Sequence, residues 1–157
     1  MSISRKEFLR TAGSTALFAY MGISVVGCSS SSTGPEEEPE GSGVDGLTID
    51  GFVLTVNLSA SSFSSLLSEG GKVLSLEGAF LAVNVDGENI RVFTNVCTHT
   101  RCTDQWSFSP NQFTCNCHGS TFNNAGEVTG GPANGDLTEY QVTRTNNTIV
   151  IDKTVTV

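Results

Sequence analysis

Two histidines and four of the five cysteines of this 157-residue chain lie within one short stretch. His99 and His118 are the only histidines, and each lies within three residues of a cysteine, in CTHTRC (97–102) and in CNCHGS (115–120). A lone histidine is more often a core or surface residue, but matched cysteine and histidine clusters on two segments indicate a metal site. The candidate ligands are Cys97, His99, Cys115 and His118.

Two kinds of metal site could use these four residues. One is a tetrahedral zinc site with two thiolates and two imidazoles, although it leaves Cys102 and Cys117 unassigned and C-x-H is tight for zinc-finger spacing. The other is an iron–sulfur cluster that has two cysteines on one iron and two histidines on its neighbour. The short spacings suit the second arrangement, because each motif then supplies one ligand to each iron.

The two motifs together resemble the signature of the Rieske [2Fe–2S] family, C-T-H-x-x-C followed by C-x-C-H-G-S. The resemblance strictly covers residues 97–120 and, more loosely, the domain around them. It implies one Rieske [2Fe–2S] cluster, whose irons would be held by a cysteine pair and a histidine pair: Cys97 with Cys115, and His99 with His118. It also implies a disulfide between Cys102 and Cys117. Quinol–cytochrome c oxidoreductases have this disulfide, and oxygenase ferredoxins generally lack it.

Further positions match the family or depart from it. Ser120 matches a serine whose hydroxyl bonds a bridging sulfide, whereas Phe122 stands where high-potential members carry a tyrosine. We therefore expect a reduction potential in the middle of the Rieske range. The segment GGPAN (130–134), with Gly131 and Pro132, resembles the loop that covers the cluster. Thr100 and Arg101 replace the Leu-Gly of quinol-oxidising members, which makes the cluster face more polar.

Residues 46–157 are expected to form one all-β domain, and the resemblance implies a small antiparallel Rieske-type fold of stacked sheets. Short runs rich in Val, Ile, Leu, Phe and Thr favour strands. They cover 47–58, 72–76, 79–85, 89–96, 139–144 and 148–157. Asp86-Gly87 and Asn146-Asn147 predict hairpin turns. The serine-rich segment 59–71 is expected to form at most a helical turn. Between residues 96 and 135 strand patterns give way to turn formers, so this segment is the expected cluster-binding subdomain of two loops.

The first 45 residues are predicted to lie outside this domain. Residues 1–28 have three basic residues before an uncharged run, which is typical of an export signal. SRKEFLR resembles a twin-arginine signal, and VVGC resembles a lipobox that would make Cys28 the lipidated anchor. Residues 29–45 hold Ser, Gly, Pro and Glu without a large apolar cluster, which is typical of a flexible linker.

Charge and compartment complete the prediction. Fifteen acidic and five basic residues lie from Cys28 onward, a balance that disfavours nucleic acid as a partner. We expect a one-electron carrier in the bacterial cell envelope, tethered to the membrane, with a redox protein such as a cytochrome as partner. It is expected to act either independently or as a subunit of a quinol-oxidising respiratory complex. The alternatives are a structural zinc module of the envelope and the ferredoxin component of an oxygenase.

Overall fold

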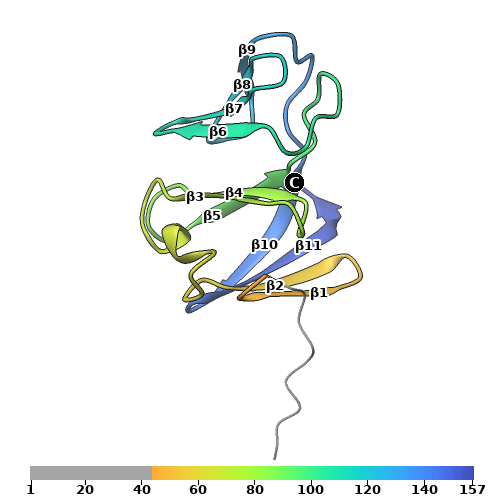
Figure 1. The fold of residues 1–157 in the computed structure, drawn as a ribbon. Helices are drawn as coiled ribbons and strands as arrows, with labels where there is room; N and C mark the ends of the chain where they lie inside the picture. Colours follow the sequence, from red (N-terminus) through yellow and green to blue (C-terminus); the bar gives the residue numbers. More distant parts are fainter. Residues whose placement is uncertain (1–43) are drawn as a thin grey trace, which may run out of the picture. The chain divides into compact units, whose positions relative to one another are not determined.

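The structure is a computed structural model that describes residues 44–157, and these form a nearly all-β domain of two antiparallel sheets. The expected export signal, Cys28 and most of the expected linker lie outside the described residues. The larger sheet has seven strands in the order β1-β2-β11-β10-β5-β4-β3, and the smaller has four in the order β6-β7-β8-β9 (Figure 1). Within residues 44–157, no helix has the length and apolar character that crossing a membrane would need.

The larger sheet follows the predicted hydrophobic runs. Its strands are β1 (Leu47–Asp50), β2 (Val53–Asn57), β3 (Lys72–Ser75), β4 (Phe80–Asn84), β5 (Ile90–Thr94), β10 (Glu139–Thr145) and β11 (Thr148–Thr156). The first expected run is two strands, because the chain turns at Gly51, which has a φ of 59°. The segment expected to form a helical turn contains a short 3-10 helix, η2 (Ser64–Leu67).

Both predicted hairpin turns are confirmed. The loop 85–89 joins β4 to β5, and Gly87 in it has a φ of 95°. Asn84 Oδ1 accepts the backbone N–H of Gly87 at 2.6 Å, which closes this turn. The second turn joins β10 to β11, where Asn146 has a φ of 53°. Asparagine tolerates this left-handed conformation better than most residues do.

The sequence shows no clear strand pattern between residues 96 and 135, but the segment contains short strands as well as loops. That segment contains β6 (Trp106–Ser109), β7 (Gln112–Cys115), β8 (Ser120–Asn123) and β9 (Val128–Gly130). Each strand has only three or four residues, and turn formers such as Gly, Pro and Asn lie between the strands. A strand that short shows too little alternation to be recognised, although pairing with its neighbours still satisfies its backbone groups.

Strand β4 is buried on both faces and separates two apolar cores. Phe80 and Ala82 face the first core, which fills the space between β4–β5 and the strands β1, β2 and β11. Leu81 and Val83 face the second core, where β4 and β5 pack against the small sheet. Successive side chains of a strand point to opposite faces. One strand therefore contributes to both cores, and the layers lie in the order seen in Figure 1.

We expect Leu81→Ala to lower the free energy of unfolding by about 2–5 kcal/mol, because the substitution leaves a cavity in the second core. Val150→Ala is the matched control on β11, where the side chain is 38% exposed. It should change the free energy by less than about 0.5 kcal/mol. Urea unfolding of both variants measures the difference, and equal effects would contradict the double burial of β4.

Candidate metal centre

The two cysteine–histidine motifs form neighbouring loops at the end of the molecule farthest from β1 and β2 (Figure 1). The first loop follows β5 and is closed by two backbone hydrogen bonds, from Cys97 N to Cys102 O at 2.8 Å and from Arg101 N to Cys97 O at 2.9 Å. The second joins β7 to β8, and Gly119 N donates to Cys115 O at 2.9 Å. Both loops thus have a defined backbone.

The candidate thiols are buried and free. Cys97 is 2% exposed and Cys115 is 1% exposed, and neither forms a disulfide. Burial raises the pKa of the Cys115 thiol, and its hydrogen bond with Cys97 raises the pKa further. The two thiols are in hydrogen-bond contact inside the second apolar core, beside β7 and β8. This arrangement suits a metal that binds both cysteines as thiolates.

The two imidazoles lie beside one another nearer the surface. The ring centroids of His99 and His118 are 4.7 Å apart, and the rings are nearly perpendicular. His99 Nδ1 is buried without a hydrogen-bond partner among the described residues. His118 Nδ1 lies 3.2 Å from the hydroxyl of Thr100. A buried, unpaired ring nitrogen is unusual unless a metal or water occupies it, so the donor set fits a metal centre.

A disulfide joins the two loops. Cys102 and Cys117 are bonded, with Cα atoms 6.6 Å apart, as the resemblance implied. The Cys115 sulfur lies within 4.8 Å of both sulfurs of this bond. These three sulfurs are not a ligand set of their own, because two of them are bonded to each other. The disulfide instead holds the loops together beside the free thiols.

The segment 130–135 packs onto the second loop. Gly131 has a φ of 80°, and a Cβ there would lie 2.5 Å from Gly119 O. Ala133 N donates to the buried hydroxyl of Ser120 at 3.1 Å, and Thr98 donates to Gly135 O at 2.6 Å. Pro132 itself is exposed. The close approach requires a residue without a side chain at 131, and the segment contacts both ligand loops.

Ser120 and Phe122 lie on β8 beneath this loop, and both are fully buried. Because the Ser120 oxygen accepts from Ala133, its own proton stays available to a further acceptor. The Phe122 ring packs 5.8 Å from Trp106 and offers no donor.

The sequence analysis missed Asn95 as a support of the first loop. Asn95 is 2% exposed, and its Nδ2 donates to Thr103 O at 3.0 Å. Its carbonyl accepts the indole N–H of Trp106 at 2.9 Å. The residue therefore ties the two ends of the loop to each other and its start to Trp106 at the beginning of β6. A polar residue just before Cys97 was the available signal, but each of its hydrogen bonds has a backbone carbonyl as acceptor, which leaves no trace in a side-chain pattern.

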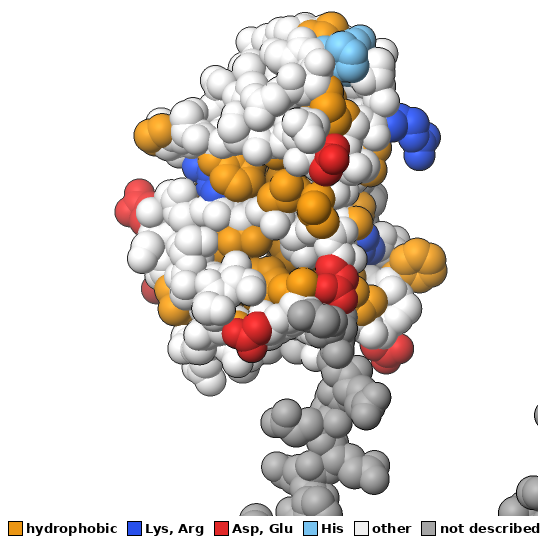
Figure 2. All heavy atoms as spheres, viewed as in Figure 1, with side chains coloured by type: hydrophobic (Ala, Val, Ile, Leu, Met, Phe, Trp, Pro, Cys, Tyr) orange, Lys and Arg blue, Asp and Glu red, His pale blue; other side chains and the backbone are white. Residues whose placement is uncertain are grey.

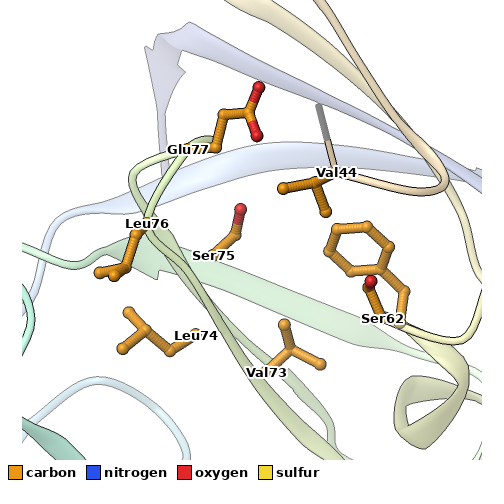
Figure 3. A pocket seen from close by; sticks show the side chains of 8 residues that line it. Val44, Ser62, Val73, Leu74, Ser75, Leu76 and Glu77 are labelled. Carbon is orange, nitrogen blue, oxygen red and sulfur yellow. The ribbon is translucent and has the colours of Figure 1, made fainter. Parts of the chain in front are cut away.

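The open pocket beside β3 is a separate feature. It has a volume of about 340 Å³, and its lining includes Val73, Leu74 and Glu77 (Figure 3). None of the candidate ligands lines it.

Comparison with known families decides which metal centre this is. The model of the Rieske [2Fe–2S] domain matches residues 60–141, more than half of the chain. The chain belongs to the Rieske family. Such a domain carries one [2Fe–2S] cluster, and its chemistry is one-electron transfer through that cluster. The matched residues include both ligand motifs.

Relatives of the chain are iron–sulfur subunits of cytochrome b6-f complexes. That of Synechococcus sp. (strain CC9605) is 30% identical over 120 residues, which are 73% of this chain and 67% of the relative. That of Cyanothece sp. (strain PCC 7425 / ATCC 29141) is 53% identical over 38 residues, 24% of this chain and 21% of the relative. The chain thus covers from about a fifth to two thirds of these relatives.

A solved structure is also similar, that of the cyanobacterial plasma membrane Rieske protein PetC3 from Synechocystis PCC 6803. It has 30% sequence identity and a TM-score of 0.43, and the match covers 51% of this chain and 82% of that one.

We expect Gly131→Ala to loosen the covering segment and shorten the lifetime of the bound cluster, because the added methyl group meets the Gly119 carbonyl. Gly87→Ala is the matched control, since Gly87 also has a positive φ but nothing lies within 4 Å of its Cβ position. Visible absorbance during incubation with a chelator measures cluster loss. Equal rates in the two variants would mean that only the backbone conformation matters.

Removal of the disulfide should destabilise the domain. Cys102→Ser combined with Cys117→Ser removes it without leaving a reactive thiol, and chain entropy predicts a loss of about 3 kcal/mol in the free energy of unfolding. We also expect faster cluster loss, because the two loops are then held only by the cluster and the core. Thermal unfolding followed by the visible absorbance of the cluster measures both the stability of the domain and the loss of the cluster. An unchanged cluster lifetime would argue against a stapling role and favour the ferredoxin alternative.

Proposed function

We propose that Cys97 and Cys115 bind one iron of the cluster and that His99 and His118 bind the other. One observation supports this assignment: the two buried free thiols are in contact with each other, and the two imidazoles lie beside each other, with one member of each pair from each motif. The unpaired Nδ1 of His99 supports it. Cys102 and Cys117 are excluded as ligands by their disulfide.

The residues around the ligands have distinct tasks in this proposal. When bound, the cluster supplies a site that accepts and releases one electron, and imidazole ligands raise its potential relative to all-cysteine clusters. Because Cys97 and Cys115 are buried, water would be excluded from the side of the cluster that faces the core. Ser120 offers a hydroxyl proton toward the cluster and thereby raises the potential. The exposed His118 marks the surface through which electrons would enter and leave.

In the cell we propose a membrane-tethered electron carrier of the bacterial envelope. Residues 1–28 would serve as an export signal of the twin-arginine type, Cys28 as a lipid anchor, and residues 29–45 as a tether to a domain that spans 46–157. A cytochrome is the proposed partner, because the relatives are subunits of cytochrome b6-f complexes.

Two roles remain within this class, an independent carrier and a quinol-oxidising subunit. We favour the carrier, because Thr100 and Arg101 are both exposed beside the ligands and make this surface polar. An apolar quinol ring would lose contacts there that an apolar side chain provides.

Metal analysis of the full chain tests the ligand assignment. We expect two irons and two acid-labile sulfides per chain, as the cluster formula requires. The variants Cys97→Ala and His118→Ala should each lose the irons and the sulfides, because each substitution removes a proposed ligand. Asn116→Ala changes an exposed residue on the same loop as His118 and should retain both. One zinc and no sulfide would establish the zinc module instead.

The potential offers a second test. Phe122→Tyr should raise the reduction potential of the full chain by about 60 mV, since a hydrogen bond to a charged group contributes about 1.5 kcal/mol. Phe113→Tyr is the matched control, because Phe113 is equally buried in the same core. Protein-film voltammetry measures both. Equal shifts would show that polarity of the core, and not a specific hydrogen bond, sets the potential.

A further inference from the structure

Arg101 differs from every other cation of the described domain. Residues 44–157 contain five Lys and Arg side chains. Four are bound by groups of the chain itself: Lys72 by Pro110 O, Arg91 by Glu139, Arg144 by Glu88 O, and Lys153 by Gly78 O. The Arg101 guanidinium is exposed and has no hydrogen bond or ion pair with any residue in 44–157.

The backbone holds Arg101 in a fixed position. Its φ is 59°, a left-handed conformation that non-glycine residues rarely adopt. The hydrogen bond from its N–H to Cys97 O keeps this conformation, and the disulfide of Cys102 anchors the next residue. The start of the side chain is therefore rigid, and only its outer part remains free to meet a partner.

Few charged side chains lie near Arg101 in the sequence, and the nearest is the exposed Asp104, 4.0 Å from the Cys102 sulfur. We define the cluster tip as six residues of the two ligand loops and the covering segment: His99, Thr100, Arg101, His118, Gly119 and Pro132. Arg101 is the only Lys, Arg, Asp or Glu among them. Figure 2 shows histidine atoms at the surface of this end, with one acidic side chain below them in the upper part of the view and the others lower on the molecule.

The rest of the domain has the opposite sign. Residues 44–157 contain eleven acidic and five basic residues, so the domain has a formal net charge of −6. Most of this surface would repel an acidic partner, and Arg101 is the one Lys or Arg side chain of residues 44–157 that belongs to the cluster tip. Its attraction would favour an approach at the tip, where the proposed ligands lie.

We propose that the cluster tip docks the carboxylate-bearing face of a redox protein, with Arg101 as the residue that recognises it. This inference rests on the proposed electron-transfer function and names its class of partner. A guanidinium binds a carboxylate through two parallel hydrogen bonds, which adds orientation to attraction. Such a contact would place the partner beside the exposed His118.

The test compares Arg101→Gln with Arg144→Gln, which removes the same charge from a site outside the tip. The reduced full chain is mixed at low ionic strength with hexacyanoferrate(III) or with tris(phenanthroline)cobalt(III). In each reaction the protein loses one electron, and the metal of the oxidant gains it. We expect Arg101→Gln to lower the rate of oxidation by the anionic reagent several-fold and to leave the rate with the cationic reagent unchanged. Arg144→Gln should lower the rate with the anionic reagent much less. Added salt should remove the difference.

An acidic and a basic cytochrome, used in the same way, distinguish a protein surface from a small anion. Arg101→Gln should lower the rate of electron transfer to the acidic cytochrome and leave the rate to the basic cytochrome unchanged. Similar effects of the two variants, or a rate with the acidic cytochrome that does not respond to Arg101→Gln, would overturn the proposal.

A binding measurement separates failure of this proposal from failure of the proposed function. Hexacyanochromate(III) is an anionic paramagnetic probe that exchanges no electron with the protein. We expect it to broaden NMR signals near the tip, such as Asn134, more than signals near Arg144, and Arg101→Gln should abolish this preference. The extra broadening that the probe causes reports binding and requires no electron transfer. Broadening that is uniform over the surface would overturn the docking proposal even in a protein with an intact cluster.

Discussion

The burial of β4 and β5 on both faces is the constraint on which the rest of the structure depends. One face closes the core of the seven-stranded sheet, and the other supports the small sheet that carries the ligand loops. An antiparallel sheet often leaves one face in water. Here the second face is covered instead, so the cluster-binding sheet has a fixed support. The ion pair of Arg91 with Glu139 joins β5 to β10, the strands through which the chain enters and leaves that sheet.

The site itself is assembled by short local contacts above this support. Cys115 ends β7 and Ser120 begins β8, and the two residues are paired across the hairpin. The second ligand loop is therefore positioned by strand register. The first loop has no such partner strand, and it depends on its own backbone hydrogen bonds, on Asn95 and on the disulfide. Strand pairing thus holds the second loop, whereas hydrogen bonds and a disulfide hold the first, and the two loops together provide the proposed ligands.

Charge is distributed to match this division of the molecule. The acidic residues give most of the domain a negative surface, while the tip carries one unpaired cation. The other four cations are engaged in internal contacts and contribute to structure. Lys153, for example, donates to two backbone carbonyls and lies over the Tyr140 ring. Within residues 44–157, the one guanidinium without a hydrogen bond or ion pair belongs to Arg101, close in sequence to the proposed ligands Cys97 and His99.

The sequence by itself determined the family, the cofactor, the disulfide and the main strands, because these depend on residue types at fixed spacings. CTHTRC and CNCHGS identify the candidate ligands without any knowledge of the fold, and the longer apolar runs predict the larger sheet. The strands β6–β9 could not be predicted, since three or four residues show too little alternation. Only the tertiary structure decided that Gly131 packs against Gly119, that Asn95 supports the first loop, and that Arg101 is unpaired. Each of these depends on contacts between backbone groups or between distant segments, which spacing along the chain does not encode.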